Sequence, residues 1–497
     1  MMKPVATVSR LGAAILIAGF ALLLWPSLVV FAAASIIGSA IGLVVLYVSI
    51  DGRDQTRISW LLATALLLAY DGGSISTYLS ASSPQEFAIL TKDRPIELIS
   101  SALALVHIIC GLLLLIGRLE RPATAAILDS TADNWFSLLL ACGGLGLIAL
   151  GYAFGDLGYM GIQTDAAGRI SVIGAAASLV EGPLAGVAGY LAARGRQPLS
   201  RLFYAMVVTL VTLAVVPTGR RAILLVLLIA TIGFALGGGL RRLSLGHKVA
   251  AIAIGGLFAY VTSSYFFALR LATWELGNTA ALSDQLWLGL DFMLSPSLKE
   301  RFNTLFYDNV RERTFVLGYL SDLISAVGSS GPLYGDALEY YLRLCIPSAL
   351  DPNKDQIIAY QMVETLVHPK LGLPVIDEAN TILTDGVTDF GLAGALLYTS
   401  GLVVLMRGAI SAIQRIGSPI TVMFGTFTVI SLVLKPELTL DEYLVPLRNL
   451  AAFIPLMWIA EALPSLSRRS PPGATSAGPR KLPGHKLPGQ WPLRSGR

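Results

Sequence analysis

Long apolar runs alternate with short polar connections along most of this chain. The first run, residues 11–50, holds forty residues without a charge. A helix needs about 20 apolar residues to cross a bilayer core, so this run predicts two spans with a hairpin at the Trp-Pro-Ser of residues 25–27. The run is too long for the core of a signal peptide, and apolar sequence resumes beyond the alanines at 32–34. A retained helical hairpin is therefore favoured.

Ten further apolar runs predict ten more spans, which makes twelve. They lie at residues 58–79, 97–117, 135–153, 170–193, 200–217, 221–240, 248–269, 388–406, 418–434 and 444–463. This pattern predicts an all-α polytopic membrane protein. Residues 1–269 would hold transmembrane helices one to nine, and residues 388–463 helices ten to twelve.

An even number of spans puts both termini on one side, and the basic residues indicate which side. The connections on the N-terminal side and the C-terminal tail hold 21 of the 36 lysines and arginines, but only six of the 32 acids. Because lysine and arginine gather in cytoplasmic connections, both termini are predicted to be cytoplasmic.

Two segments interrupt the alternation of span and short connection. Residues 270–387 form a long outer connection with amphipathic patterns near 283–294, 298–326 and 335–345, and they predict a helical cap. Residues 464–497 are rich in Pro, Gly, Ser and Arg and predict a disordered, basic cytoplasmic tail.

Composition narrows the class of protein further. With 54% apolar and 14% charged residues, a soluble globular protein is excluded, and three cysteines exclude a disulfide-built secreted domain. The chain contains no Gly-rich phosphate loop, HExxH, CxxC or GxSxG motif. No soluble catalytic module, metal site, cofactor or nucleic-acid partner is therefore expected.

Four arginines lie near the predicted outer boundary. Arg220 and Arg221 follow a tight Pro-Thr-Gly turn at the head of a span, where the helix dipole is already positive. This arrangement suits a bound anion, above all a phosphate, and the alternative is an anchor in lipid headgroups. Arg270 closes a span, where an interfacial arginine also snorkels. Arg448 lies inside the last span and predicts a partner, either a nearby acid or a ligand phosphate.

A second polar group leads from the cap into span ten: His368, Glu378, Asn380, Asp385 and Asp389. A histidine or carboxylate here is a candidate general base toward a hydroxyl. The alternative is a solvated acidic entry with an aspartate that caps the helix, and a lone histidine is usually structural.

Two more carboxylates, Asp71 and Glu181, are predicted inside spans. Buried carboxylates in a membrane suggest function, most often a proton relay. A helix break at the Asp-Gly-Gly-Ser of residues 71–74 and a kink at the Glu-Gly-Pro of residues 181–183 are the favoured alternatives.

Together these features resemble a family of bacterial glycan assembly proteins. The order is a Gly-Arg turn between two mid-chain spans, an arginine that closes a later span, a large outer loop, and then His-Pro, an Asn and a Phe-Gly-Leu-Ala-Gly entry. It resembles the O-antigen or oligosaccharide repeat-unit polymerases (Wzy type) and the related O-antigen ligases. The resemblance implies a membrane-embedded glycosyltransferase architecture (GT-C-like) with a periplasmic cap, in the bacterial inner membrane.

The resemblance also implies a reaction and residue roles. An undecaprenyl-diphosphate-linked oligosaccharide is the donor, and a sugar hydroxyl of another lipid-linked unit is the acceptor, without a metal. Membrane lipids, a chain-length regulator and a flippase are the implied partners. Arginines would stabilise the departing diphosphate. The implied roles are diphosphate binding for Arg220, Arg221 and Arg448, catalysis for Arg270, His368, Asp385 and Asp389, and sugar contacts for Glu378, Asn380, Tyr340 and Tyr341.

Three other functions stay open at this point. An O-antigen ligase would use the same chemistry with another acceptor. A twelve-span lipid-linked oligosaccharide transporter or flippase is disfavoured, because the long cap interrupts only the second half of the chain. A non-catalytic assembly scaffold would tolerate loss of single candidate residues.

Overall fold

The computed structural model describes most of the chain as α-helix. It covers residues 4–51, 56–124, 135–158, 161–162, 171–195, 197–277, 281–313, 316–347, 350–351, 364–375, 378–416 and 418–467. Contacts divide the chain into two units, Met1–Glu461 and Ala462–Arg497. The packing and the sites below belong to the first unit. Most of the predicted tail, from residue 468 on, lies outside the described residues.

Twelve helices coincide with the twelve predicted spans. They are α1 (Pro4–Leu24), α2 (Leu28–Asp51), α3 (Ile58–Ser80), α5 (Ile96–Ile116), α7 (Trp135–Ala153), α8 (Val172–Arg194), α9 (Pro198–Ala214), α10 (Arg220–Leu236), α12 (Leu245–Leu276), α19 (Ile382–Gln414), α20 (Pro419–Val433) and α21 (Leu440–Ser467). In the part of the chain that is described, ten helices are long and apolar enough to cross a membrane. The remaining two, in α10 and α20, are shorter apolar helices. The prediction of an all-α polytopic membrane protein is confirmed at this level.

The first and last residues of these helices test two local predictions. The hairpin at residues 25–27 is confirmed, since α1 ends at Leu24 and α2 begins at Leu28. The helix break at residues 71–74 is wrong, because α3 runs without interruption from Ile58 to Ser80 and buries Asp71.

Short elements fill the connections. They are α4 (Pro84–Leu90), the 3-10 helices η1 (Gly117–Leu119) and η2 (Val216–Thr218), α11 (Gly239–Arg242), and the strands β1 (Leu157–Gly158) and β2 (Gly161–Ile162). The two strands pair antiparallel, with Leu157 opposite Ile162 and Gly158 opposite Gly161.

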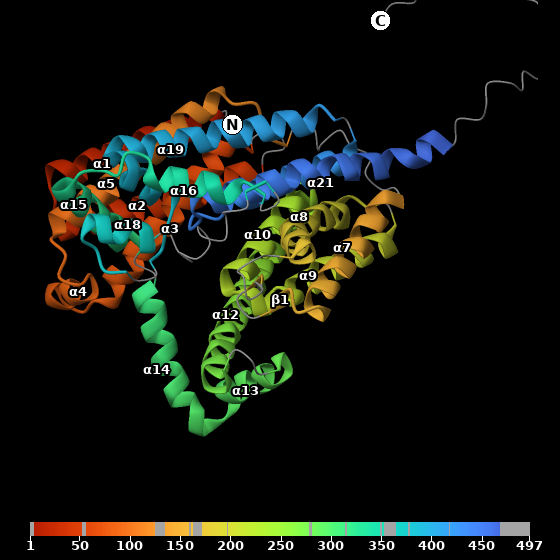
Figure 1. Cartoon of the computed structure of the whole chain (residues 1–497), viewed down its shortest axis with the longest axis horizontal. Coiled ribbons are helices and arrows are strands. Elements are labelled where there is room, and N and C mark those ends of the chain that lie inside the picture. Colours follow the sequence, from red (N-terminus) through yellow and green to blue (C-terminus); the bar gives the residue numbers. More distant parts are fainter. Residues whose placement is uncertain are drawn as a thin grey trace, which may run out of the picture. The chain divides into compact units, whose positions relative to one another are not determined.

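Glycines let neighbouring helices pack backbone to backbone. On α10, a Cβ at Gly233 would lie 2.1 Å from the Gly186 carbonyl oxygen of α8, and on α8 a Cβ at Gly189 would lie 2.3 Å from that of Ala230. A Cβ at Gly186 would also meet the ring of Phe427 in α20 at 2.6 Å. Small residues of this kind are typical of helix contacts inside membranes. They hold α8, α10 and α20 together, while α1, α2, α3 and α5 form a second group (Figure 1).

Hydrogen bonds between connections agree with the alternation of spans. On the predicted inner side, Ala123 N donates to Thr56 O at 2.8 Å, and Gln414 Nε2 donates to Ala123 O at 3.0 Å. On the predicted outer side, Arg94 forms a two-pronged ion pair with Asp322 at 2.6–2.7 Å. These bonds join connections that were predicted to share a face. The orientation in the membrane rests on the basic residues and stays a prediction.

The long connection contains the helices α13 (Leu282–Leu294), α14 (Pro296–Arg313), α15 (Val316–Ser330), α16 (Asp336–Cys345) and α18 (Glu364–Leu371). The stretch predicted at 298–326 is thus described as two helices on either side of residues 314–315. Helices α13 and α14 share a small apolar cluster with α12 that includes Phe267, Phe292 and Phe302. Helices α15, α16 and α18 instead join the main core, and α15 packs on α3, α5 and α19 (Figure 1).

Helix α19 begins earlier than predicted and is broken. A capping box at Thr381 and Thr384 starts it, and the backbone leaves helical geometry at Phe390 and at Gly391, whose φ is +64°. A φ of this sign favours glycine. The break frees two carbonyl groups, which accept hydrogen bonds from the segment between α15 and α16. Leu333 N donates to Thr388 O at 3.0 Å, and Tyr334 N donates to Asp389 O at 2.8 Å.

Candidate functional site

The predicted basic turn, residues 217–221, links η2 to α10. Gly219 has a φ of +144°, which an L side chain rarely adopts, and α10 begins at the next residue, Arg220. The N-cap residue is Gly219, which has no side chain to cap this helix end. The chain thus puts two arginine positions on the first turn of a helix whose amide groups already carry positive charge. The side chains of Arg220 and Arg221 lie outside the described part of the structure.

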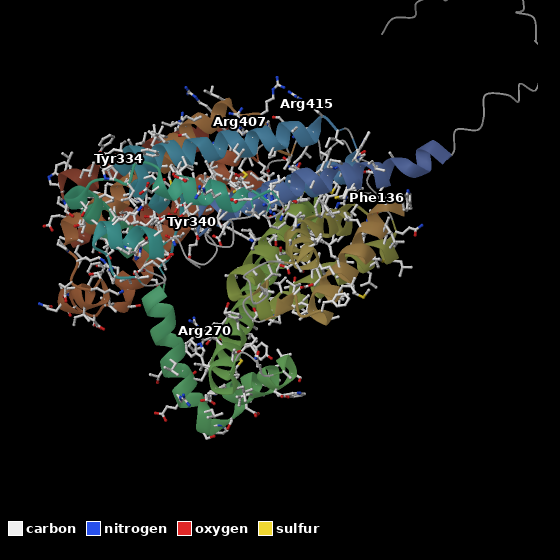
Figure 2. The ribbon with its side chains drawn as sticks, viewed as in Figure 1. Phe136, Arg270, Tyr334, Tyr340, Arg407 and Arg415 are labelled. Carbon is white, nitrogen blue, oxygen red and sulfur yellow. The ribbon has the colours of Figure 1, made fainter. Side chains whose placement is uncertain are left out.

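The structure brings this turn against α12, close to Arg270. A Cβ built on Gly219 would lie 3.9 Å from the ring of Phe266. Phe266 and Arg270 are four residues apart in α12, so they share one face of the helix. The Arg270 guanidinium is half-buried and lies 4.7 Å from the ring centre of Trp274 (Figure 2). The turn that carries Arg220 and Arg221 thus contacts α12 one helical turn before Arg270, and we name these three positions the basic group: Arg220, Arg221 and Arg270.

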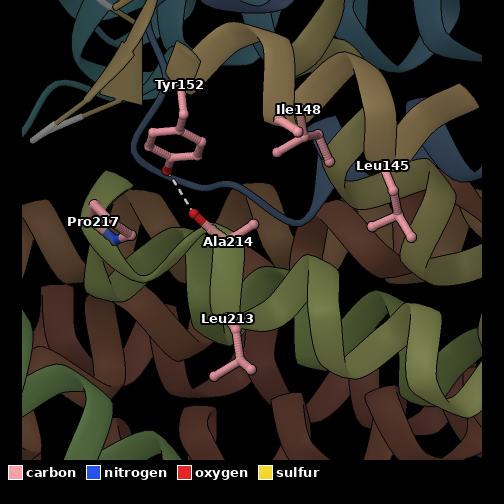
Figure 3. Close-up of a pocket in the computed structure, with 7 residues that line it drawn as sticks. Leu145, Ile148, Tyr152, Leu213, Ala214 and Pro217 are labelled. Carbon is pink, nitrogen blue, oxygen red and sulfur yellow. Dashed lines mark hydrogen bonds between the residues drawn. The ribbon is translucent and has the colours of Figure 1, made fainter.

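An apolar groove ends at the same turn. It lies between α7 and α9 and has a volume of about 330 Å³. Figure 3 draws the residues that line it, which are Leu145, Ile148, Ala149, Tyr152, Leu213, Ala214 and Pro217. The Tyr152 hydroxyl donates to Ala214 O at 2.5 Å and ties the two helices together at this end. Pro217 belongs to both the groove and the basic turn, so the groove reaches the turn that carries the Arg220 and Arg221 positions.

Arg448, the fourth predicted arginine, is engaged elsewhere. Its Nη1 donates to Cys345 O at 2.7 Å, and its Nε and Nη2 donate to Asn449 Oδ1 at 3.2 and 2.9 Å. Cys345 is the last residue of α16, where a helix carries partial negative charge. The geometry favours a structural role for Arg448, which holds α21 against the C-terminal end of α16.

Asp389 is also used by the fold. Its Oδ1 accepts from Ala337 N at 3.0 Å and its Oδ2 from Leu338 N at 2.8 Å, so the carboxylate caps the N-terminus of α16. The Tyr398 hydroxyl donates to the same carboxylate, and Asp389 is fully buried. The alternative of an aspartate cap on helix ten is therefore wrong, because Thr381 caps α19 and Asp389 caps a helix of the long connection.

Asp385, one turn earlier on α19, holds two other elements. Its Oδ1 accepts from the Tyr341 hydroxyl at 2.7 Å, and its Oδ2 accepts from Leu440 N at 2.9 Å, at the start of α21. Burial and the nearby charge of Asp385 raise the pKa of Tyr341 well above its ordinary value, so the phenol stays a proton donor. Both carboxylate oxygens of Asp385 are thus satisfied, as those of Asp389 are.

His368 lies buried on α18 between two partners. Its Nδ1 is 2.6 Å from Pro374 O, and its Nε2 is 2.8 Å from the Tyr319 hydroxyl. A carbonyl oxygen only accepts, so Nδ1 carries a proton, and in the neutral ring Nε2 accepts from Tyr319. Burial raises the pKa of Tyr319 well above its ordinary value, which keeps that phenol a donor. The one lone pair with which His368 would act as a base is therefore occupied.

Glu378 differs from these engaged groups. Among the described residues, no side chain or backbone amide donates a hydrogen bond to its carboxylate, while its neighbour Asn380 donates to Glu364 Oε1. Burial raises the pKa of Glu378, and the positive charges of Lys92 and Arg94 partly offset this effect. A half-buried carboxylate beside two cations, held without hydrogen bonds of its own, is a candidate for binding or proton transfer.

The predicted sugar-stacking pair is packed into the core. Tyr340 and Tyr341 are 8% and 1% exposed, and their rings meet edge to face with centres 5.7 Å apart. Burial raises the pKa of Tyr340 to about 12. Neither ring offers an open face. Tyr334, on the same connection, is 79% exposed and is the more accessible ring (Figure 2).

Sequence reasoning missed several partners of these residues. Glu364 precedes His368 by four residues, a spacing that places both on one face of a helix and is visible in the sequence. Tyr319, Asp322 and Arg94 carry no such signal, because the contacts that engage them join segments far apart along the chain.

The predicted residues thus fall in two places: the basic group at the positions on α10 and α12, and a polar group formed by α16, α18, α19 and the connection between α18 and α19, with Arg448 of α21 bound at the end of α16. Within the described ranges, no set of three or more His, Cys, Asp or Glu side chains is placed to hold a metal ion. Comparison of the chain with known protein families, curated proteins and solved structures gave no match.

Replacing Asp389 by alanine tests its structural role. We expect Asp389→Ala to lower the free energy of unfolding by about 2–5 kcal/mol, because two amides of α16 and the Tyr398 hydroxyl lose a charged acceptor. Unfolding in detergent micelles measures this loss. Asp336→Ala is the matched control: Asp336 lies on the first turn of α16 in an exposed ion pair with Lys370, worth about 1 kcal/mol or less. Equal losses in the two variants would contradict the capping role.

Glu378→Gln tests the raised pKa of this carboxylate through the pH dependence of stability. Because the pKa of Glu378 is raised, the folded state holds this proton more tightly than the unfolded state, and stability falls as pH rises through the folded pKa. We expect Glu378→Gln to raise the melting temperature at neutral pH by a few degrees. The gain should vanish as pH falls below the ordinary glutamate pKa of about 4.3. Glu339→Gln, at an exposed position on α16, is the control, and a gain that is independent of pH would refute the assignment.

Proposed function

We propose that this protein is a membrane-embedded glycosyltransferase that polymerises polyprenyl-diphosphate-linked oligosaccharide repeat units into a surface polysaccharide. It would act at the periplasmic face of the bacterial inner membrane, with both termini cytoplasmic. The observation that carries the proposal is the apolar groove between α7 and α9 that ends at the basic group. Hydrocarbon surface beside clustered arginine positions suits an amphiphile with an apolar chain and an anionic head.

A lipid diphosphate fits both parts of this surface. Its isoprenoid chain would lie along the groove, with Pro217 at the boundary, and its diphosphate would face Arg220, Arg221 and the amides that begin α10. Arg270, on the adjoining face of α12, adds a third positive charge. Guanidinium groups stay charged at any physiological pH and bind phosphate oxygens in pairs.

In this reaction the basic group contributes mainly positive charge. A hydroxyl oxygen of the acceptor sugar attacks the anomeric carbon of the donor, the bond from that carbon to the diphosphate oxygen breaks, and the hydroxyl proton passes to a base. Negative charge then grows on the departing lipid diphosphate. Arginines directed at this charge stabilise the transition state more than the ground state.

For the base we favour Glu378 over the other predicted groups. Asp385, Asp389 and His368 already hold helix ends or a backbone carbonyl, so proton transfer at any of them would break a bond of the fold. Glu378 is half-buried and has a raised pKa, and a base is most effective when its pKa approaches the working pH. The exposed ring of Tyr334 is a candidate platform for a sugar.

A glycan profile tests the reaction and separates it from its rivals. The strain lacks the gene and receives the wild type, Arg270→Ala or Arg415→Ala. We expect Arg270→Ala to slow chain growth by about 10²–10³-fold, since it removes one charge that stabilises the leaving group. Arg415 is an exposed arginine at the end of α19, on the predicted opposite face (Figure 2), and its loss should leave the ladder unchanged.

The glycan profile of the deletion strain distinguishes the candidate functions. Single-repeat glycan in place of a ladder supports a polymerase, whereas loss of attached chains with long lipid-linked polymer supports a ligase. An unchanged ladder would exclude both and favour transport of a lipid-linked oligosaccharide. Equal amounts of each variant in the membrane rule out a folding defect. A polymerase of this kind would work beside a flippase that supplies its donor and a regulator of chain length.

Filling the groove tests the place of the isoprenoid chain. Ala149 lines the groove, and an indole at this position would occupy much of its volume. We expect Ala149→Trp to lower kcat/KM for the lipid-linked donor about tenfold, or ~1.4 kcal/mol, mainly through KM. Leu150→Trp, at the next position on α7, points outward at 47% exposure and serves as the control. Identical kinetics for both variants would remove the groove from the proposal.

A further inference from the structure

A buried acid–base pair lies in the helix group α1, α2, α3 and α5. Asp71 of α3 and His107 of α5 are both fully buried, and Asp71 Oδ1 lies 2.8 Å from His107 Nε2. Both residues belong to helices that are long and apolar enough to span the membrane. Ionisable side chains inside a membrane are costly, so such a pair calls for an explanation.

Four helices close around the pair, and glycines permit the closure. A Cβ at Gly38 of α2 would lie 2.1 Å from Asp71 Oδ2, and a Cβ at Gly19 of α1 would lie 3.1 Å from the Cβ of His107. Besides His107, the titratable group that faces Asp71 is the Cys110 thiol of α5, which points at Ala63 O. Helices α1 and α2 meet the pair with the backbone of these glycines.

The pair does not satisfy its own polar atoms. Within the described part of the chain, Asp71 Oδ2 and His107 Nδ1 have no hydrogen-bond partner. The same holds for the hydroxyls of Ser35 and Ser39, which flank Gly38 on α2, and of Ser100, two turns before His107 on α5. A buried polar atom without a partner is energetically costly. The unpartnered atoms of Asp71 and His107 themselves therefore indicate a site whose polar groups exchange a proton.

We propose that Asp71 and His107 form a proton-binding site that exchanges one proton with solvent while the protein stays folded. With the proton bound, the pair is neutral overall, which the apolar surroundings favour, but either tautomer leaves the His107 Nδ1–H donor without an acceptor. Release of the proton to water leaves a carboxylate, an Nε2–H donor and a bare Nδ1. The deprotonated pair no longer has an unpaired Nδ1–H donor, but it carries one net negative charge. The protonated and the deprotonated pair each carry an unfavourable interaction, so the fold fixes neither protonation state.

The site also touches the polar group through its own helix. Tyr70 precedes Asp71 on α3, and its hydroxyl lies 2.7 Å from Thr381 Oγ1, the residue that caps α19. The proton site therefore lies one residue from a contact with the start of the broken helix. The assignment of the pair as a proton site does not depend on the glycosyltransferase proposal.

Histidine NMR on the whole protein tests this site. The chain has four histidines, so ¹⁵N-histidine labelling in lipid nanodiscs yields few signals, and loss of one set in His107→Gln assigns the pair. We expect the His107 nitrogen shifts to follow a one-proton transition between about pH 5 and 9. The signal of exposed His247 in the same sample serves as the reference. His107 shifts that stay constant across this pH range would overturn the proposal.

Asp71→Asn then tests whether the proton is shared. Asparagine keeps the size and the acceptor but loses the charge, so the His107 transition should move by about one pH unit or more. Asp93→Asn, an exposed change in the connection between α3 and α5, should not move it. An unmoved transition in a folded Asp71→Asn protein would refute the shared proton. If that variant does not fold, the wild-type titration alone decides the proposal.

Discussion

The hydrogen bonds of the Asp389 carboxylate are the interaction on which the packing of α16 and α19 depends. Asp389 lies one residue before the break in α19, and its carboxylate binds two backbone amides at the head of α16 and the hydroxyl of Tyr398. The carbonyls that the break frees bind the segment that leads into α16. An unpaired charge and unpaired carbonyls at this depth would cost several kcal/mol, so the break, the aspartate and α16 stabilise one another. Asp385, one turn earlier, also accepts a hydrogen bond from a backbone amide, that of Leu440, and so fixes the start of α21.

This use of charge separates two kinds of polar residue. Asp385, Asp389, His368 and Arg448 each hold an element in place, which accounts for their burial without reference to a ligand. The Asp71–His107 pair is different, because it is fully buried and, among the described residues, Asp71 Oδ2 and His107 Nδ1 have no hydrogen-bond partner. Glu378 is different because burial raises its pKa and no described group donates a hydrogen bond to its carboxylate. Natural proteins tolerate such costs mainly where a function requires them. The candidate functional groups are therefore Glu378 and the Asp71–His107 pair rather than Asp385 and Asp389.

Much of the architecture could be predicted from the amino-acid sequence. The length of apolar runs predicted twelve helices at the places where helices occur, because the thickness of a bilayer sets a length that sequence alone reveals. The Trp-Pro-Ser hairpin was equally clear, since proline disfavours a continuous helix. Boundaries were harder. Helix α19 starts at Ile382 rather than near 388, because Thr381 and Thr384 form a capping box ahead of the apolar run. Asp71 did not break α3, because a partner on another helix compensated its charge.

The sequence by itself therefore determined the class of the protein, the places and order of its long apolar helices, and the positions where charge enters them. These follow from local rules of hydropathy, length and composition. Only the tertiary structure decided which charges are satisfied. It paired Asp71 with His107, set Asp389 on α16 and brought Gly219 of the basic turn against Phe266 of α12. These contacts join residues tens to hundreds of positions apart, and their partners are selected by how helices pack rather than by any pattern along the chain.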